Sequence, residues 1–288
     1  MTVTMERMLP LYEAKMLDAY DHRDADVYKS DTAGKRQNQP HYLTDQEKID
    51  WAREAVPISW IREEVLPEGV PEWQIGFSNV TSATNERTML SAALPRAGVG
   101  NSYPVIMGEG RECLLSVFNS FVFDYVTRLK VAGLNLNYFY VKQLPVVPPP
   151  VFDASCPWAP MESLRDWITR KVLALSCTST SMLPMSEELV GHPQVYPWEP
   201  EGRFLLRSEI DAAMFHVYGI VRDDVDYIMD TFRIVRQNDE TVCGEYRTKR
   251  VILGIYDAMQ WAIDTGIPYE PIVDIAPLPV AHDESAAK

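Results

Sequence analysis

The stretch from Leu114 to Pro150 decides the fold of this chain, and it reads LLSVFNSFVFDYVTRLKVAGLNLNYFYVKQLPVVPPP. Apolar residues recur at spacings of three and four through its first half, which predicts one amphipathic helix over Leu114–Lys130. Gly133 is the expected helix stop. The aromatic and β-branched run Tyr138–Val141 predicts a strand, and Pro148–Pro150 end regular structure. A helix, a turn and a strand in this order are typical of an ordinary α+β core.

The rest of the chain divides into a strand-rich part and a helical part. Thr44 and Glu47 form a predicted capping box for a helix that runs to about Ala55. Runs of strand-forming residues bounded by turn residues predict strands at Ile58–Leu66, Trp73–Val80, Met89–Leu94 and Tyr103–Met107. The expected helices are Met161–Leu175, a weaker one from Met182, Arg203–Tyr218, Arg222–Phe232 and Glu245–Ile263. We therefore expect an α+β fold, with a mixed-strand domain over residues 44–150 and a helical C-terminal region over residues 151–266.

Composition places the chain among globular proteins. It has 288 residues, of which 46% are hydrophobic and 24% charged, enough for a sizeable core in one or two domains. No apolar run approaches the roughly 18 residues needed to cross a bilayer, and no signal peptide is visible. The four cysteines have neither paired nor metal-like spacing, which favours a reduced interior. These features predict a cytoplasmic protein with no membrane partner.

The charge distribution limits where a polyanion can bind. The formal net charge is −14, which argues against a simple nucleic-acid-binding protein because duplex DNA needs a basic footprint. Residues 77–149, however, carry four acids and six bases, whereas residues 152–288 carry 22 acids and 12 bases. The central segment is therefore the expected place for any contact with DNA.

The same central segment resembles a known family. It is similar to the target-recognition region of large adenine-specific DNA methyltransferases, namely the fused type IIG restriction-modification enzymes and related phage-exclusion methyltransferases. The matching residues are Asn119, Ser120, Phe121, Asp124, Tyr125, Arg128, Lys130, Val131, Gly133, Leu134, Asn135, Asn137, Phe139, Lys142, Gln143, Leu144 and Pro145. Ala132 stands where the family more often has glycine. Further blocks of the resemblance cover Pro10–Arg23, Ala83–Pro104 and Arg203–Met259.

The resemblance implies recognition without catalysis in this chain. The family's catalytic domain holds S-adenosylmethionine in a glycine-rich strand-loop-helix and carries an Asn/Asp-Pro-Pro-Tyr/Phe motif, and neither motif occurs in this sequence. Residues 1–43 are then a junction that follows a missing catalytic domain, and residues 267–288 are a Pro-rich, partly disordered tail. We expect no cofactor in this chain, and double-stranded DNA and a separate methyltransferase catalytic chain as partners. Whether the chain is an enzyme stays open, because a family-based classification would still name it an adenine-specific methyltransferase.

Nine residues are the candidates for DNA contact within the blocks that the resemblance selects. Arg and Lys bind phosphates, whereas Asn, Gln and Arg can read base edges in the major groove. The candidates are Arg87, Arg96, Asn101, Arg128, Lys130, Asn135, Asn137, Lys142 and Gln143. For Arg87, Arg96 and Asn101 the alternative is that they cap strands and pair with nearby acids. The whole set can equally be scaffold, since base readers usually differ between family members.

Two other functions are compatible with the sequence. One is an interaction subunit that docks on a separate methyltransferase or defence protein through the acidic helical region, without binding DNA by itself. The other is a complete enzyme of an unrecognised type. The carboxylates Asp211, Asp223, Asp224 and Asp226 could suggest a metal site, but negative charge at helix N-termini is the simpler explanation.

Overall fold

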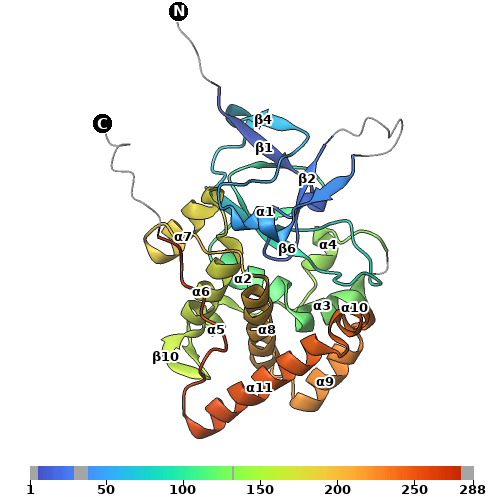
Figure 1. The fold of residues 1–288 in the computed structure, drawn as a ribbon, viewed down its shortest axis with the longest axis vertical. Coiled ribbons are helices and arrows are strands. Elements are labelled where there is room, and N and C mark those ends of the chain that lie inside the picture. The colour runs from blue at the N-terminus through green and yellow to red at the C-terminus, as the bar shows by residue number, and fades with distance from the viewer. Residues whose placement is uncertain (1–5, 29–37, 132, 280–288) are drawn as a thin grey trace, which may run out of the picture.

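The computed structural model describes residues 6–28, 38–131 and 133–279, and it has a strand-rich part beside a helical part (Figure 1). The strand-rich part comes from the first third of the chain, and the helices of the last two thirds lie below it in that view. This arrangement confirms the expected α+β class with a helical C-terminal region.

Two small sheets form the centre of the strand-rich part. The N-terminal strand β1 (Met8–Tyr12) lies between β4 (Trp60–Arg62), which is antiparallel to it, and β7 (Gly98–Val99), which is parallel. In the second sheet, β5 (Trp73–Phe77) lies between β6 (Ser91–Pro95) and β8 (Val105–Ile106), both antiparallel to it. Every residue of β5 and β6 is buried, as expected for strands with apolar runs that are covered on both faces.

Two pairs of short strands and several short helical turns complete the strand-rich part and the segments that follow it. The paired strands are β2 (Ala25–Val27) with β3 (Pro40–Tyr42), and β9 (Ser155–Cys156) with β10 (Ala159–Ser163). The 3-10 turns are η1 (Ala14–Met16), η2 (Glu63–Val65) and η3 (Thr180–Met182). The short helices are α1 (Asp45–Ile49), α4 (Tyr138–Val141) and α5 (Pro149–Asp153).

The longer helices surround α8 (Pro200–Val217), which packs against α3, α6 and α11. The other long helices are α2 (Arg111–Phe118), α3 (Phe121–Lys130), α6 (Leu164–Ser176), α7 (Leu183–Val190), α9 (Arg222–Asp230), α10 (Arg233–Cys243) and α11 (Arg247–Thr265). Local signals set several of their ends. The Ser163 side chain accepts a hydrogen bond from the Asp166 amide at the start of α6, and left-handed Gly191, Gly244 and Gly266 end α7, α10 and α11.

One apolar core runs through both parts of the molecule. It includes Trp73 of β5, Phe118 of α2, Trp167 of α6 and Phe215 of α8, each at most 1% exposed. The predicted domains over residues 44–150 and 151–266 therefore contribute to a shared core. A smaller cluster around Tyr12 fills the space beside the first sheet.

The N-terminal region is joined to this body by a fully buried arginine. Arg23 donates hydrogen bonds to the carbonyls of Lys48, Asp50, Arg53 and Thr178, at 2.6–2.8 Å. Because one guanidinium satisfies carbonyls from several segments, the described part of the predicted junction is an integral piece of the fold.

The single helix expected over Leu114–Lys130 is in fact two helices, α2 and α3, which meet at Asn119 and Ser120. The Asn119 amide exchanges two hydrogen bonds with the backbone of Ser91, each 2.9 Å long. Ser120 accepts a hydrogen bond from the Phe123 amide and caps α3. The apolar spacing continues across the break, so the sequence pattern does not reveal it.

The strand expected over Tyr138–Val141 is the short helix α4. Its N-cap is Asn137, whose side chain accepts hydrogen bonds from the amides of Phe139 and Tyr140. The cap overrides the strand propensity of the aromatic residues. The predicted helix stop also differs: α3 ends at Lys130, and Gly133 lies in the following loop.

Two other predicted elements have the expected type at their start but differ in length. The Thr44 capping box is present, yet its helix ends at Ile49 rather than near Ala55. The run predicted as one strand over Ile58–Leu66 is β4 followed by η2. Helix α10 was not expected at all, because its sequence is mostly charged and polar.

The C-terminal segment packs on the helices as far as it is described. Tyr269 and Ile275 are buried, Tyr269 donates its amide to the Trp158 carbonyl at 2.8 Å, and Leu278 donates to the Val195 carbonyl at 2.7 Å. The expectation of a partly disordered tail is therefore wrong for residues 267–279, and the rest of that tail lies outside the described residues. Within the described ranges, no helix combines the length and the apolar character needed to cross a membrane. All four cysteines are free.

Candidate nucleic-acid interface

Two of the candidate arginines bind a buried carboxylate rather than facing solvent. Arg87 donates from Nε to Oδ2 of Asp124 at 2.9 Å, and Arg128 donates from Nη2 to the same oxygen at 3.3 Å. Asp124 is fully buried and also accepts from the amides of Thr88 and Met89 at 3.0 Å. Each guanidinium lies about 4.1 Å from an aromatic ring, Arg87 over Phe121 and Arg128 over Phe232. These arginines tie the loop before β6 to α3.

Arg96 is held in a similar way on the other side of the strand-rich part. Its Nε donates to Glu63 at 3.1 Å, and its Nη1 donates to the Val70 carbonyl. Glu72 lies 3.8 Å away. For Arg87 and Arg96 the structure thus shows the pairing with acids that was the alternative to DNA contact.

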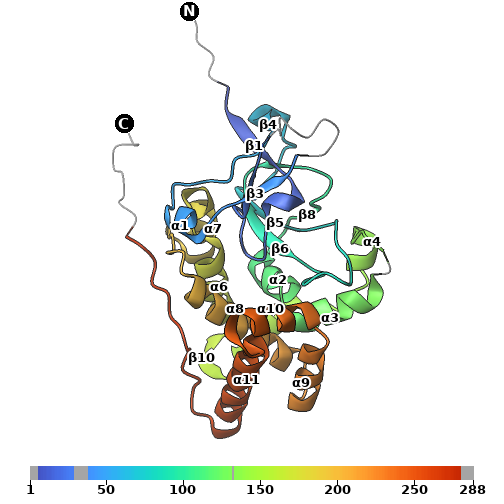
Figure 2. The same cartoon turned by 45° about the vertical axis from the view of Figure 1, so that its right-hand side comes forward.

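The remaining candidates are exposed side chains, and most lie on or next to α4. Exposed positions are Asn101 in the turn between β7 and β8, Lys130 at the end of α3, and Asn135, Asn137, Lys142 and Gln143 around α4. Asn137 is occupied as the cap of α4, and Gln143 donates to the Phe139 carbonyl at 2.9 Å. Figure 2 shows α4 at the edge of the molecule, beyond α3.

The backbone holds this edge in place. Leu136 donates to the Asn79 carbonyl at 2.7 Å, and Thr81 donates to the Leu134 carbonyl at 3.1 Å. Tyr138 donates its hydroxyl to the Val105 carbonyl at 2.6 Å and packs edge-on against Phe77 of β5. The segment is therefore a built projection rather than a loose loop.

Exposed apolar side chains lie among the polar candidates, and sequence reasoning missed them. Leu129, Leu134 and Phe139 are 72%, 69% and 71% exposed. We call the exposed set Leu129, Lys130, Leu134, Asn135, Phe139, Lys142 and Gln143 the α4 surface. Its two lysines, two amides and three large apolar side chains are groups that suit a partner both anionic and partly apolar.

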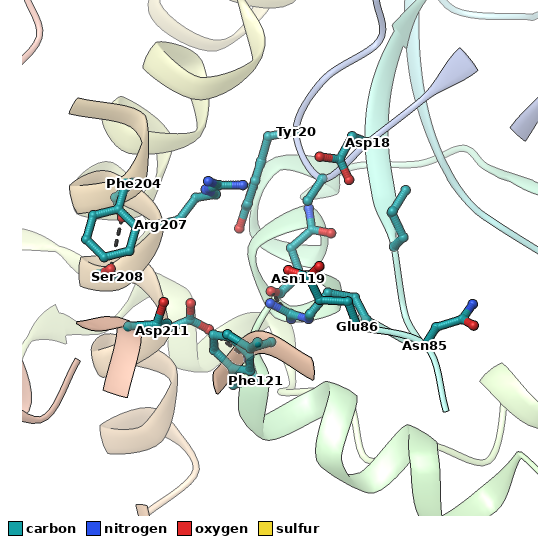
Figure 3. A pocket seen from close by; sticks show the side chains of 15 residues that line it. Asp18, Tyr20, Asn85, Glu86, Asn119, Phe121, Phe204, Arg207, Ser208 and Asp211 are labelled. Atoms are coloured by element: carbon teal, nitrogen blue, oxygen red, sulfur yellow. Dashed lines mark hydrogen bonds between the residues drawn. The ribbon is translucent and has the colours of Figure 1, made fainter. Parts of the chain in front are cut away.

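A second feature lies where the strand-rich part meets the helices. A cavity of about 350 Å³ is lined by residues from the N-terminal loop, the loop before β6, the α2–α3 junction, α8, α10 and α11. Figure 3 shows Arg207 and Asp211 projecting into it from α8, with Tyr20 opposite. The expectation that Asp211 is a charge at a helix N-terminus is wrong, since it is buried within α8; Asp223 and Asp224 do lie in the first turn of α9.

Comparisons of the chain with protein-family models, with curated proteins and with solved structures found no match.

Proposed function

We propose that this chain is the DNA sequence-recognition portion of an adenine-specific DNA methyltransferase of a restriction-modification or phage-defence system. The resemblance of residues 119–145 to the target-recognition region of that family motivates the proposal. The observation that carries it is the exposure of Lys130, Asn135, Lys142 and Gln143 within the short segment that contains α4. In this proposal the chain acts in the cytoplasm, on double-stranded DNA, beside a separate catalytic chain.

Pairing with acids separates the lysines and arginines that are available to DNA from those that stabilise the fold. Among the described residues, neither Lys130 nor Lys142 has an acidic partner, whereas Arg87, Arg96 and Arg128 each do. An unpaired, exposed ammonium can replace the counterions of a phosphate without first breaking a bond inside the protein. We therefore assign phosphate contact to the two lysines, and base-edge contact to Asn135 and Gln143.

The acidic helical region makes the binding strongly dependent on salt and on the partner. Because residues 152–288 carry ten more acids than bases, DNA is repelled from most of the surface. The proposal therefore expects weak binding by the isolated chain that falls steeply with salt, and tighter binding when a basic catalytic chain holds the DNA.

The test is binding of the purified chain to duplex DNA across a salt series. Replacing Lys130 and Lys142 together with glutamine should weaken binding and reduce the slope of log affinity against log salt by about two. The matched control replaces Arg236 and Arg250 with glutamine, which removes the same charge from exposed positions on the helical part. Equal effects of the two double variants, or no binding by the parent chain at low salt, would contradict the proposal.

Asn135 and Asn137 are tested separately for a role in DNA sequence preference. Asn135→Ala should relax the preference among DNA sequences and leave stability unchanged, since Asn135 is exposed. Asn137→Ala removes a helix cap, and such a loss costs about 1 kcal/mol, so Asn137→Asp is the informative variant because it keeps the cap. An unchanged sequence preference in Asn135→Ala would remove that residue from the reading set.

One observation favours the alternative function of a docking subunit. The acidic helices carry exposed apolar side chains, including Tyr227 of α9, Val242 of α10 and Trp261 of α11. Apolar groups of this size on a helical surface are common at protein–protein contacts. This alternative would be supported if the parent co-purified with a catalytic chain and the Trp261→Ala variant did not. It also requires that neither the parent nor the Lys130, Lys142 double variant binds DNA.

A further inference from the structure

The cavity between the strand-rich and helical parts contains polar groups that the protein itself does not satisfy. The Tyr20 side chain is 2% exposed, and its hydroxyl is buried without a hydrogen-bond partner among the described residues. A buried hydroxyl without a partner is costly, and ligands or water usually satisfy such groups. Figure 3 shows this hydroxyl end directed into the cavity.

Arg207 is the second unsatisfied group. It lies on α8 within the cavity wall, is only partly exposed, and has no hydrogen bond or ion pair among the described residues. The other arginines of the neighbourhood are engaged: Arg87 with Asp124, and Arg203 with the Leu175 carbonyl. A half-buried guanidinium with free donors is suited to a carboxylate, which it can bind with two parallel hydrogen bonds.

Asp211 supplies the opposite charge one helical turn away. It is 5% exposed, and the structure shows one hydrogen bond to it, from the Phe121 amide to Oδ1 at 2.7 Å. Although Arg207 and Asp211 have the i,i+4 spacing of a helical ion pair, they do not pair. Burial raises the pKa of Asp211 to about 7, so a cation placed beside it would favour its ionised form.

A tight turn sets the backbone at Tyr20. Tyr20 has a φ of +61°, and no other non-glycine residue in the described ranges has a positive φ. Asp18 and Asp21 close the turn with two backbone hydrogen bonds, each 2.9 Å long. The Tyr20 amide also donates to the Ser91 carbonyl at 3.0 Å, which holds the turn beside β6 at the cavity wall.

We propose that this cavity binds a small zwitterion with an α-ammonium and a carboxylate, as in a free amino acid. The carboxylate accepts hydrogen bonds from Arg207 and from the Tyr20 hydroxyl, and the ammonium donates to Asp211. The backbone positions of Arg207 and Asp211 are about 6 Å apart along α8, one helical turn, so both side chains can reach the head of one amino acid.

The rest of the lining narrows the class of ligand. Asp18 and Glu86 are exposed at the cavity and disfavour a ligand of net negative charge such as a nucleotide. Leu90, Phe121 and Phe204 provide apolar wall for a side chain. The volume of about 350 Å³ is at the lower end of the range for small-molecule sites, which fits a single amino acid.

The experiment is calorimetric titration of the intact chain with the twenty standard amino acids, followed by analogues of the tightest. For alanine, the analogues are propionate, which lacks the ammonium, and ethylammonium, which lacks the carboxylate. We expect at least one amino acid to bind, and each single-charge analogue to bind at least tenfold more weakly. If none of the twenty binds below 10 mM, or if the carboxylate analogue binds as tightly as the amino acid, the proposal is wrong.

Variants assign the roles. Arg207→Gln and Asp211→Asn should each weaken binding at least tenfold, whereas Arg250→Gln, an exposed control on α11, should leave it unchanged. Tyr20→Phe removes only the unpartnered hydroxyl, so the chain should fold as before and bind three- to tenfold more weakly. This variant keeps the proposal testable if the charge variants fold poorly. Unchanged affinity in well-folded Tyr20→Phe and Arg207→Gln would place any binding elsewhere and overturn the assignment.

Discussion

At the scale of single residues, Asp211 couples stability to pH. Burial raises its pKa from the ordinary 3.8 to about 7, against the opposing effects of Arg87, Arg207 and the Phe121 amide, while Asp124 adds to the rise. The folded state therefore holds the Asp211 proton more tightly than the unfolded state does. It follows that the contribution of Asp211 to stability declines as pH rises from about 4 to about 7, and is constant above that.

We predict that Asp211→Asn removes this decline. The variant should match the parent near pH 4.5 and exceed its free energy of unfolding at pH 8, by at most about 4 kcal/mol, the equivalent of a three-unit shift. Urea unfolding at several pH values measures the difference. Burial raises the pKa of Asp24 to about 6, within this range, but Asp24 is present in both proteins and its effect cancels. A parent and variant that differ equally at all pH values would contradict the prediction.

Arg87 is the residue-scale test of scaffold against DNA contact. Its removal takes one charged hydrogen bond from Asp124, which keeps Arg128 and the amides of Thr88 and Met89. We therefore expect Arg87→Ala to lose about 1.5–3 kcal/mol of stability in thermal or urea unfolding, the range for a hydrogen bond to a charged group. Lys130→Ala, at an exposed position, should change stability by less than about 0.5 kcal/mol. Equal stability of the two variants would return Arg87 to the set of free DNA-binding residues.

At the scale of elements, the α2–α3 junction depends on one side chain. Asn119 accepts from the Ser91 amide and donates to the Ser91 carbonyl, which also accepts from the Tyr20 amide. Asn119→Ala therefore leaves the buried Ser91 amide without a partner, and it should lower the free energy of unfolding by about 1–3 kcal/mol, the cost of one unsatisfied buried backbone group. Asn85→Ala, an exposed amide of the same cavity rim, is the control and should have little effect. A small loss in Asn119→Ala would mean that water replaces the amide at Ser91.

The same junction shows what sequence patterns could and could not predict. Apolar spacing located α6, α8, α9 and α11 to within a few residues, because their packing faces keep a helical period. It missed the break at Asn119, whose partner Ser91 lies 28 residues away. It also assigned α4 as a strand, because propensity outweighed the cap at Asn137. Helix α10 has few apolar residues, so period alone carries little signal there.

The site was less predictable than the elements for the same reason. Exposure separates Lys130 and Lys142 from Arg87 and Arg128, which bind Asp124. The i,i+4 spacing of Asp124 and Arg128 is visible in the sequence, whereas the contact of Asp124 with Arg87, 37 residues away, is not. The cavity joins Tyr20 to Arg207, which are 187 residues apart in the sequence. Only the i,i+4 spacing of Arg207 and Asp211 on a predicted helix could have drawn attention to it.

At the scale of the whole molecule, the shared core opposes the division into independent domains. The buried ion pair between Lys171 of α6 and Glu209 of α8 is joined by the Tyr269 hydroxyl at 2.7 Å and the Ile272 amide at 2.8 Å. The described part of the C-terminal segment is thereby fixed to the central helices. On the other side, Arg23 ties the N-terminal loops to the carbonyl of Thr178. Polar networks and core together connect the first and last described segments to the same body.

This connectivity predicts one cooperative unfolding transition. Far-UV circular dichroism reports mainly the helical part, whereas fluorescence from the buried Trp73 of β5 reports the strand-rich part once the other six tryptophans are replaced with phenylalanine. The two signals should give the same urea midpoint and the same slope, as two-state unfolding requires. Asp211→Asn should then shift both midpoints together, because its Phe121 bond joins α8 to α3. Separate midpoints, or a shift confined to one signal, would show that the strand-rich and helical parts fold independently and that DNA recognition can be isolated with the former.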